Sequence, residues 1–296
     1  GEMSLYTDQP RTATVVAVRD SVLVRLGKAA FHQLLAASPR LSLLMTRQLI
    51  HRMQPQPARA DLARPVVLAL LPITAGVDLP ALAQRLAAQL ALQARGADGQ
   101  PARVCVVDAA QLDQALQQPG LARQRDDGAG EVERRIGAQI DTLEAAHDFL
   151  LLLADDQATP WTQRCTRHAD ELLLLADADA PVQLHDSETR FLVPTDAAAA
   201  GAATRRSEAA QTLVLLHPAD RRSPQHTRRW LDRRPVTDHL HIRPTLDRDM
   251  ARLARLQART GVGLVLAGGG ARGLAHLGIL QALQAQGIEV DVVGGT

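Results

Sequence analysis

The chain has 296 residues, of which 46% are hydrophobic and 22% charged, and its formal net charge at pH 7 is +1. This balance excludes a disordered chain, fits about two globular domains and gives no overall attraction to nucleic acid. No apolar run approaches the ~18 residues that a membrane-spanning helix needs. Two cysteines lie far apart, at Cys105 and Cys165, which indicates reduced thiols in a cytoplasmic protein.

The first segment is predicted to contain a β-hairpin followed by two helices. Apolar residues alternate over 14–18 and 22–26, with a polar turn between them. Apolar residues at helical spacing then run from 31 to 50, and Pro39 stands where the second helix would begin. Residues 54–64 carry two prolines and several Ala and Arg, as expected of a linker.

The middle of the chain alternates apolar strands with helical patterns. Strands are predicted at 66–71, 103–108, 149–154, 171–176 and 212–217, and helices at 79–94, 109–118, 131–147 and 161–169. Apolar strands that alternate with helices favour a parallel, doubly wound sheet. The sequence therefore predicts an α/β domain with a Rossmann-like layout over residues 65–217.

The turn after the first of these strands is where a P-loop would lie. A P-loop needs several glycines to curl around phosphates and a Lys to neutralise them. Residues 71–78 contain one glycine and no Lys, and Asp78 would repel a phosphate. The layout resembles partition-type P-loop ATPases, but we expect the phosphate chemistry to be lost. Asp108, Asp155 and Asp156 follow strands, and we interpret them as solvated carboxylates, not as metal ligands.

Residues 218–260 are rich in arginine and are predicted to form a basic helical connector. The six arginines around Trp230 suit either an anionic partner or a solvated face paired with nearby Asp residues, and we favour the second: Arg221, Arg222, Arg228, Arg229, Arg233 and Arg234. His239 and His241 share one face of a short strand, but two imidazoles without a third ligand do not predict a metal site. A helix is expected over 246–259, with Gly261 as its cap.

The last segment, 261–296, carries the most informative pattern. An apolar run at 262–267 predicts a buried strand, a triple glycine follows, and Leu at 274, 277, 280 and 283 predicts a helix. A second strand at 290–293 leads to Gly294, Gly295 and Thr296. A strand that turns through glycines into a helix directs backbone N–H groups at one point, which suits a phosphate or a developing oxyanion.

One interpretation of this pattern is a dinucleotide site in an oxidoreductase. Gly268-x-Gly270-x-x-Gly273 has the letters of the fingerprint, but a fingerprint alone is a weak signal. Confirmation needs an acidic residue at the end of the next strand, where it would bind the ribose. Asp291 stands at the start of that strand instead, and Arg272 fits poorly against a pyrophosphate.

A second interpretation explains more residues. The glycine loop, with His276, Gly278 and Gly294-Gly295-Thr296, resembles the start of a patatin-like phospholipase domain. The resemblance implies an oxyanion-hole loop, formed by Gly268, Gly269, Gly270, Arg272 and Gly273. It further implies the start of a Gly-x-Ser-x-Gly nucleophile elbow, formed by Gly295 and Thr296. It also implies a Ser–Asp dyad whose Ser directly follows Thr296 and whose Asp lies further on.

The start of the chain carries a second resemblance. Gly1-Glu2 and Pro10-Arg11-Thr12-Ala13 are similar to the phosphate-binding cassette of a cyclic nucleotide-binding domain. The resemblance implies that Glu2 binds the ribose 2′-hydroxyl and Arg11 the cyclic phosphate, with Thr12 beside it. A cyclic nucleotide, cAMP or cGMP, would then be a regulator, and no cofactor would be required for catalysis.

Domains in this order resemble the bacterial relatives of neuropathy target esterase. We therefore predict an α/β protein with five parts: the C-terminal part of a cyclic nucleotide-binding β-roll with its helices at 1–54, a linker at 55–64, the Rossmann-like domain at 65–217, the connector at 218–260 and the first β-α-β of a patatin-like domain at 261–296.

The resemblance implies a serine esterase that acts on lipid or lysophospholipid acyl esters. It would be cytoplasmic, with peripheral contact at the inner membrane and no nucleic-acid partner. We expect the chain to be a fragment truncated at both ends and inactive by itself, because it has no nucleophile. A non-enzymatic cyclic nucleotide-sensing module with an inactive hydrolase remains the third interpretation.

Overall fold

The computed structural model describes residues 23–53, 64, 66–96, 98–125, 130–192, 207 and 209–295. The chain divides into two compact units, Gly1–Ala63 and Arg64–Thr296. We describe each unit by itself.

The described part of the first unit contains two helices, α2 (Lys28–Ala37) and α3 (Pro39–Met53). Ser38 separates them, and its backbone N–H donates to the Leu34 carbonyl while Pro39 begins α3. This confirms the two predicted helices. The predicted strand at 14–18 lies outside the described residues. Residues 23–26 are not a strand, and Leu23 and Val24 are exposed. A strand is stable only when its backbone pairs with another.

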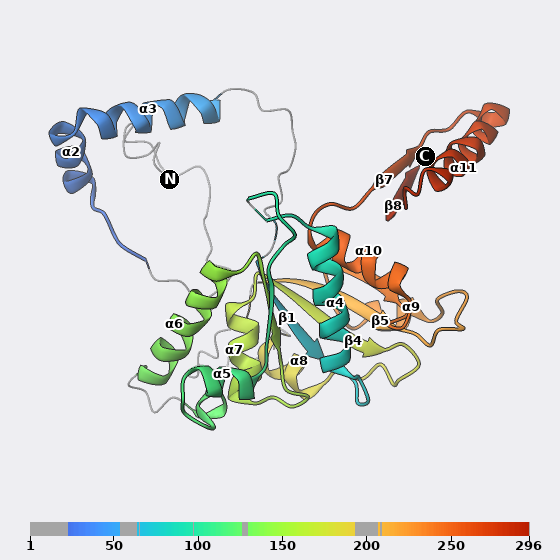
Figure 1. Ribbon diagram of the computed structural model, residues 1–296, viewed down its shortest axis with the longest axis horizontal. Coiled ribbons are helices and arrows are strands. Elements are labelled where there is room, and N and C mark those ends of the chain that lie inside the picture. The colour runs from blue at the N-terminus through green and yellow to red at the C-terminus, as the bar shows by residue number, and fades with distance from the viewer. Residues whose placement is uncertain are drawn as a thin grey trace. The chain divides into compact units, whose positions relative to one another are not determined.

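The second unit is built on a six-stranded sheet with the order β2-β3-β1-β4-β5-β6, and each neighbouring pair is parallel (Figure 1). Its strands are β1 (Val67–Pro72), β2 (Val104–Val107), β3 (Phe149–Leu153), β4 (Glu171–Asp177), β5 (Ala210–Leu216) and β6 (Asp238–Ile242). The five predicted strands are confirmed, and each observed strand end lies within two residues of the predicted one. Every residue of β1 and β3 is buried, as expected for strands covered on both faces.

The predicted connector at 218–260 is wrong, because this segment continues the sheet. β6 pairs with β5 in register Thr212↔Asp238 through Leu216↔Ile242. The connector was predicted from its many arginines, whereas sheet pairing depends on distant residues that composition does not reveal. The α/β domain therefore extends well beyond residue 217.

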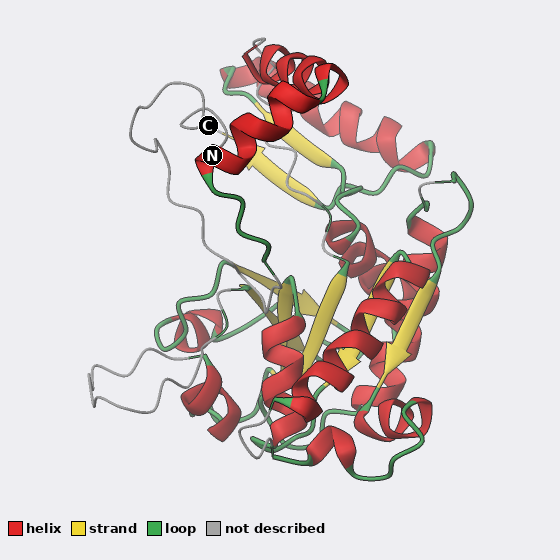
Figure 2. Cartoon of the chain, turned by 90° about the vertical axis from the view of Figure 1, so that its left-hand side faces the viewer, coloured by secondary structure: helices red, strands yellow, loops and turns green. Residues whose placement is uncertain are grey.

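Helices cover both faces of the sheet (Figure 2). One face packs Leu68 and Leu70 of β1 against α4 (Leu79–Gln93) and α10 (Asp247–Gln257). The other face packs Val67, Ala69 and Leu71 against the remaining helices, which are α5 (Ala109–Ala115), η1 (Leu121–Arg123), α6 (Glu131–Ala146), α7 (Pro160–His168), α8 (Asp186–Phe191) and α9 (Thr227–Leu231). The short helix α8 was not predicted.

Arg234 belongs to the interior, not to the solvated face that its neighbours suggested. Its side chain and that of Glu188 are each 2% exposed, and two hydrogen bonds of 2.7 and 2.9 Å join them. The guanidinium also donates to the carbonyls of Val182 and Gln183 and lies 4.9 Å from the centre of the Trp230 ring. By contrast, Arg228 pairs with Asp232 in the open, as predicted for a surface helix.

The C-terminal segment forms β7 (Gly263–Leu266), η2 (Gly270–Leu274), α11 (Ala275–Ala285) and β8 (Val292–Gly295), and β7 and β8 pair in parallel. The predicted strand–glycine–helix–strand order is confirmed, but the prediction that the first strand is buried is wrong. Val265 is 81% exposed and no described residue of α11 is buried. This small sheet has two strands in the described part of the chain, so its apolar faces are not covered there.

Asp291 connects these strands to α10. Its buried carboxylate accepts from the Val262 N–H at 2.9 Å and from Arg255 at 2.6 to 3.1 Å, and the Asp291 carbonyl accepts from Arg252 at 3.0 Å. Burial alone would raise the pKa of Asp291, but the bonds from Arg255 and Val262 outweigh it, so the pKa is lowered. The Asp291 carboxylate is thus buried and engaged in hydrogen bonds within the protein, which argues against a ribose-binding role.

Candidate functional site

The glycine loop after β7 turns directly into a helix. β7 ends at Leu266, and η2 begins at Gly270 and leads into α11 without a break. Gly270 has φ +56°, a backbone conformation that residues other than glycine rarely adopt. A Cβ at this position would meet no described atom within 4 Å. The glycine is therefore required by backbone conformation, not by space. Arg272 lies within η2, so the whole loop motif is part of this turn.

The glycine loop and the predicted elbow leave the same edge of the small sheet. The parallel register pairs Leu266, the last residue of β7, with Gly295, the last residue of β8. A Cβ on Gly295 would lie 3.0 Å from the Leu266 carbonyl oxygen, so a side chain there would force this pair of strands to shift. The structure therefore places the start of the glycine loop beside the start of the predicted elbow. Thr296, Glu2, Arg11 and Thr12 lie outside the described residues.

The turn between β1 and α4 is closed to phosphate. Asp78 caps α4, and its carboxylate accepts from the Ala81 N–H at 3.1 Å. A phosphate in a P-loop takes its hydrogen bonds from this end of the helix. Asp108 caps α5 in the same way, and Asp155 accepts from Arg123 and Thr159. Of the three carboxylates that we predicted to be solvated, Asp108 and Asp155 are half-buried capping and pairing groups, whereas Asp156 is exposed.

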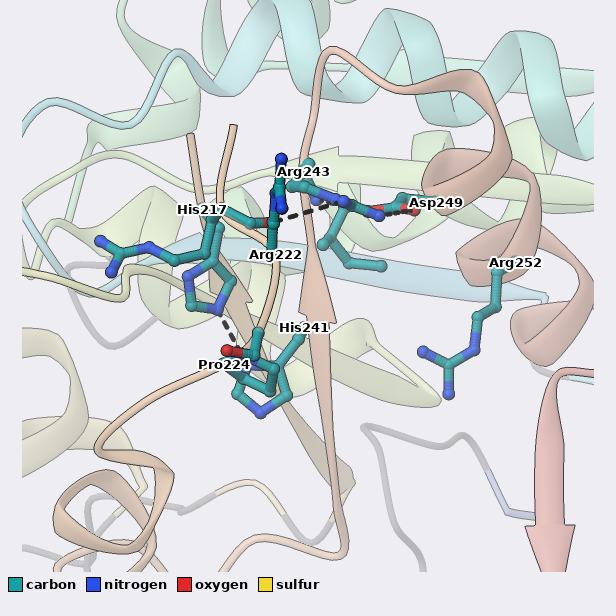
Figure 3. A pocket seen from close by; sticks show the side chains of 10 residues that line it. His217, Arg222, Pro224, His241, Arg243, Asp249 and Arg252 are labelled. Atoms are coloured by element: carbon teal, nitrogen blue, oxygen red, sulfur yellow. Dashed lines mark hydrogen bonds and ion pairs between the residues drawn. The ribbon is translucent and has the colours of Figure 1, made fainter. Parts of the chain in front are cut away.

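A basic pocket of about 290 Å³ lies at the carboxyl ends of β5 and β6 (Figure 3). His217 follows β5 directly, Arg243 follows β6, and α10 contributes Arg252. Arg221 and Arg222 come from the loop after β5. Sequence reasoning noted some of these arginines but missed His217, Arg243 and Arg252. For His217 and Arg243 the available signal was their position just after parallel strands, since ligands of open α/β sheets bind at that edge, whereas Arg252 lies inside α10 and had no such signal.

Two histidines in this pocket are joined in a short hydrogen-bonded chain. His217 Nε2 lies 2.9 Å from His241 Nδ1, and His241 Nε2 lies 3.2 Å from the Thr227 hydroxyl. Burial lowers the pKa of His241 to about 4, with help from the positive charge of neighbouring His217, His239 and Arg252. Burial and then Arg221 lower the pKa of His217. Both rings are therefore neutral at pH 7. Among the described residues, no group of three or more His, Cys, Asp or Glu side chains is arranged to hold a metal ion.

The histidine pair predicts a loss of stability in mild acid. In the unfolded chain these rings titrate near pH 6.5, whereas His241 in the folded protein titrates at about 4. Between these values the unfolded state binds more protons, so the stabilisation is complete above pH 6.5 and is lost as the pH falls toward 4. We expect roughly 1–2 kcal/mol, which is less than the full shift implies because the ring is only half-buried.

Urea unfolding at pH 7.5, 6.5, 5.5 and 4.5 measures this effect. His241→Phe should flatten the dependence over this range, because it removes the titrating ring. His226→Asn is the control, since His226 is exposed and has φ +62°, which Asn tolerates. Equal pH dependence in the native chain and His241→Phe would contradict the assignment.

A parallel six-stranded sheet with helices on both faces has the layout of a P-loop-like domain, and its first turn is lysine-free and capped by Asp78. The chain belongs to the Neuropathy Target Esterase family, whose P-loop like domain model matches residues 66–262. This span includes the segment that we had predicted as a connector. A cyclic nucleotide-binding domain model matches residues 1–38, and a patatin-like phospholipase model matches residues 264–296.

Relatives align over the whole chain. Lysophospholipase nte1 of Neurospora crassa is 28% identical, and patatin-like phospholipase domain-containing protein 6 of Homo sapiens is 31% identical. Neuropathy target esterase sws of Drosophila persimilis is 30% identical. The chain spans 22 to 23% of the length of these relatives. A solved plasmid partition protein from Borrelia burgdorferi is similar over 67% of this chain and 97% of the partition protein, with a TM-score of 0.45 and 11% sequence identity.

Proposed function

We propose that a protein containing this chain and the remainder of a patatin-like domain hydrolyses acyl esters of phospholipids or lysophospholipids. The observation that carries the proposal is the Leu266↔Gly295 register, which starts the glycine loop and the elbow from adjacent strand ends. An oxyanion hole must lie within hydrogen-bond reach of the acyl group attacked by the nucleophile. The matched family models and the names of the relatives support the same chemistry.

The proposed reaction uses a Ser–Asp dyad. The Ser that follows Thr296 in the patatin pattern attacks the ester carbonyl carbon, while the Asp further along accepts the Ser proton. Backbone N–H groups around Gly269 and Gly270 hold the oxyanion, and Arg272 fixes the loop. Collapse of this intermediate breaks the bond to the alcohol oxygen, which takes up the proton and leaves. Water then attacks the acyl-enzyme and releases the fatty acid.

Regulation by a cyclic nucleotide is a second part of the proposal. The cyclic nucleotide-binding model match over residues 1–38 supports it. Glu2, Arg11 and Thr12 would hold cAMP or cGMP, and the nucleotide would regulate hydrolysis without taking part in it. We also place the substrate at a membrane surface, which the protein contacts peripherally from the cytoplasm. Among the described residues, no helix is both long and apolar enough to cross a bilayer.

Fatty-acid release from lysophosphatidylcholine tests the proposal. The longer protein should release fatty acid and should be labelled by a fluorophosphonate, which reacts with activated serines. Both signals should vanish when the Ser after Thr296 is replaced by Ala, and the 296-residue chain should show neither. Hydrolysis that survives this replacement would overturn the mechanism. Binding of cAMP without any labelling would favour the sensing module, and saturable NADH fluorescence would favour the oxidoreductase.

A further inference from the structure

The basic pocket lies where an open α/β sheet offers a ligand site. It is formed by the carboxyl ends of β5 and β6 and by α10 (Figure 3). The usual phosphate position of such a domain, the start of α4, is occupied by the Asp78 carboxylate. The basic pocket beside His217 is not lined by that turn, whereas a larger neighbouring pocket is lined by Gly76, Val77 and Asp78 of it.

The arginines of this pocket carry more charge than its carboxylate neutralises. Arg243 is paired with Asp249 through bonds of 2.7 and 3.0 Å, and Arg221 is paired with Asp179. Arg222 and Arg252 form no ion pair with any carboxylate in the described part of the chain. Arg252 uses its Nε to hold the Asp291 carbonyl, which leaves its terminal nitrogens available. Arg252 also lowers the pKa of the buried Asp291 carboxylate by its charge, so Arg222 is the pocket arginine whose charge no described carboxylate offsets, and this favours an anion.

His217 adds a buried polar atom that has no partner. The residue is 7% exposed, and its Nδ1 atom is buried without a hydrogen bond to any described residue. If Thr227 donates to His241 and His241 donates to His217 Nε2, the remaining proton of neutral His217 is on Nδ1. An unsatisfied buried donor destabilises a protein. This atom is enclosed by the protein, so the pocket is bordered by the other atoms of the His217 ring.

A second, larger pocket of about 600 Å³ shares His217 with the first. Apolar and small residues line much of it, among them Val77, Leu82, Leu216 and Pro244. Asp177 and Asp179 also line it and offer acceptors for hydroxyl or ammonium groups. A ligand with its anionic end among the arginines would therefore have room for an organic body on the other side of His217.

We infer that this double pocket binds an organic phosphate, with its phosphate beside Arg222 in the basic pocket and its body in the larger pocket on the other side of His217. This site is separate from the esterase centre, and its ligand is not the reacting ester. The same phosphate chemistry occurs in a nucleotide and in a lipid headgroup. The two sources differ in the body that the larger pocket would have to accept.

Isothermal titration of the 296-residue chain with inorganic phosphate, AMP and glycerophosphocholine tests this inference. AMP or glycerophosphocholine should bind at least 10-fold more tightly than phosphate. Arg222→Gln should weaken the tighter ligand about 10-fold or more, and His217→Leu should do the same. Arg222 is exposed, so its replacement leaves the fold intact even if His217→Leu does not fold. Arg229→Gln is the control, because Arg229 is exposed on α9 and does not line either pocket.

The outcomes distinguish a nucleotide from a lipid headgroup as the ligand, and they also show when the inference is wrong. Tighter binding of AMP identifies a nucleotide, and tighter binding of glycerophosphocholine identifies a lipid headgroup. Residues 1–38 match a cyclic nucleotide-binding domain, so only the affinity lost in Arg222→Gln is assigned to this pocket. Absence of binding, or equal weakening by Arg222→Gln and Arg229→Gln, overturns the inference. None of these measurements depends on ester hydrolysis.

Discussion

Replacing Gly270 with Ala should lower the kcat of the ester hydrolysis proposed for the longer protein by about 10²–10³-fold, the loss typical of removing one oxyanion-hole donor. Gly270 has φ +56°, and Ala disfavours this conformation by about 1 kcal/mol or more. Relaxation of the strain would turn the neighbouring N–H groups away from the oxyanion. The KM for the ester should change little, because the donors act mainly on charge that develops in the transition state.

Gly287→Ala provides a matched control for this prediction. Gly287 has φ +70° and also meets no described atom within 4 Å of a built Cβ, but it lies beyond the end of α11. Both variants should lose a similar amount of thermal stability, and only Gly270→Ala should lose turnover. Steady-state kinetics with a soluble acyl ester, together with thermal unfolding, measures the two effects. Equal turnover in the two variants would show that Gly270 is not part of the oxyanion hole.

Arg234→Met should destabilise the 296-residue chain by about 3–5 kcal/mol, the usual result of leaving one partner of a buried ion pair alone. Glu188 is 2% exposed, and without Arg234 its carboxylate would keep only the His185 N–H as a described donor. Two backbone carbonyls would also lose a donor. Urea unfolding followed by circular dichroism measures the free energy of unfolding.

Arg228→Met separates burial from charge in this experiment. Arg228 is on the same short helix as Trp230 and pairs with Asp232 at 3.7 Å, with both side chains exposed. Its replacement should change stability by at most about 0.5 kcal/mol. The double variant Arg234→Met/Glu188→Gln should recover part of the loss, because no uncompensated charge stays buried. Comparable destabilisation by Arg228→Met and Arg234→Met would show that burial of the pair is unimportant.

The sheet was predictable where its strands are buried on both sides. β1 and β3 read as unbroken apolar runs, and the helices between them show amphipathic spacing. β6 failed this criterion, because Asp238, His239 and His241 make it polar and only its pairing with β5 shows its role. The burial of Arg234 could not be predicted for a related reason. Its burial depends on Glu188, 46 residues away, and no local pattern encodes that pair.

The two sites differ in how local their signals are. The glycine loop occupies six consecutive residues, so its strand–turn–helix form was predictable from Gly268 to Gly273. The basic pocket draws on the ends of two strands and on α10. Its residues become neighbours only when the sheet forms, so Arg221 and Arg222 were interpreted as surface charge and Arg243 and Arg252 were missed.

The position of Arg252 has a consequence for the control of the proposed hydrolysis. It lines the basic pocket and donates to the Asp291 carbonyl, while Arg255, one turn further along α10, grips the Asp291 carboxylate. Asp291 directly precedes β8, the strand that leads to the predicted elbow. A phosphate that reorients Arg252 would thus be energetically coupled to the acyl-ester site. Such coupling is reciprocal: an effector that tightens substrate binding tenfold is itself bound ten times more tightly when substrate is present.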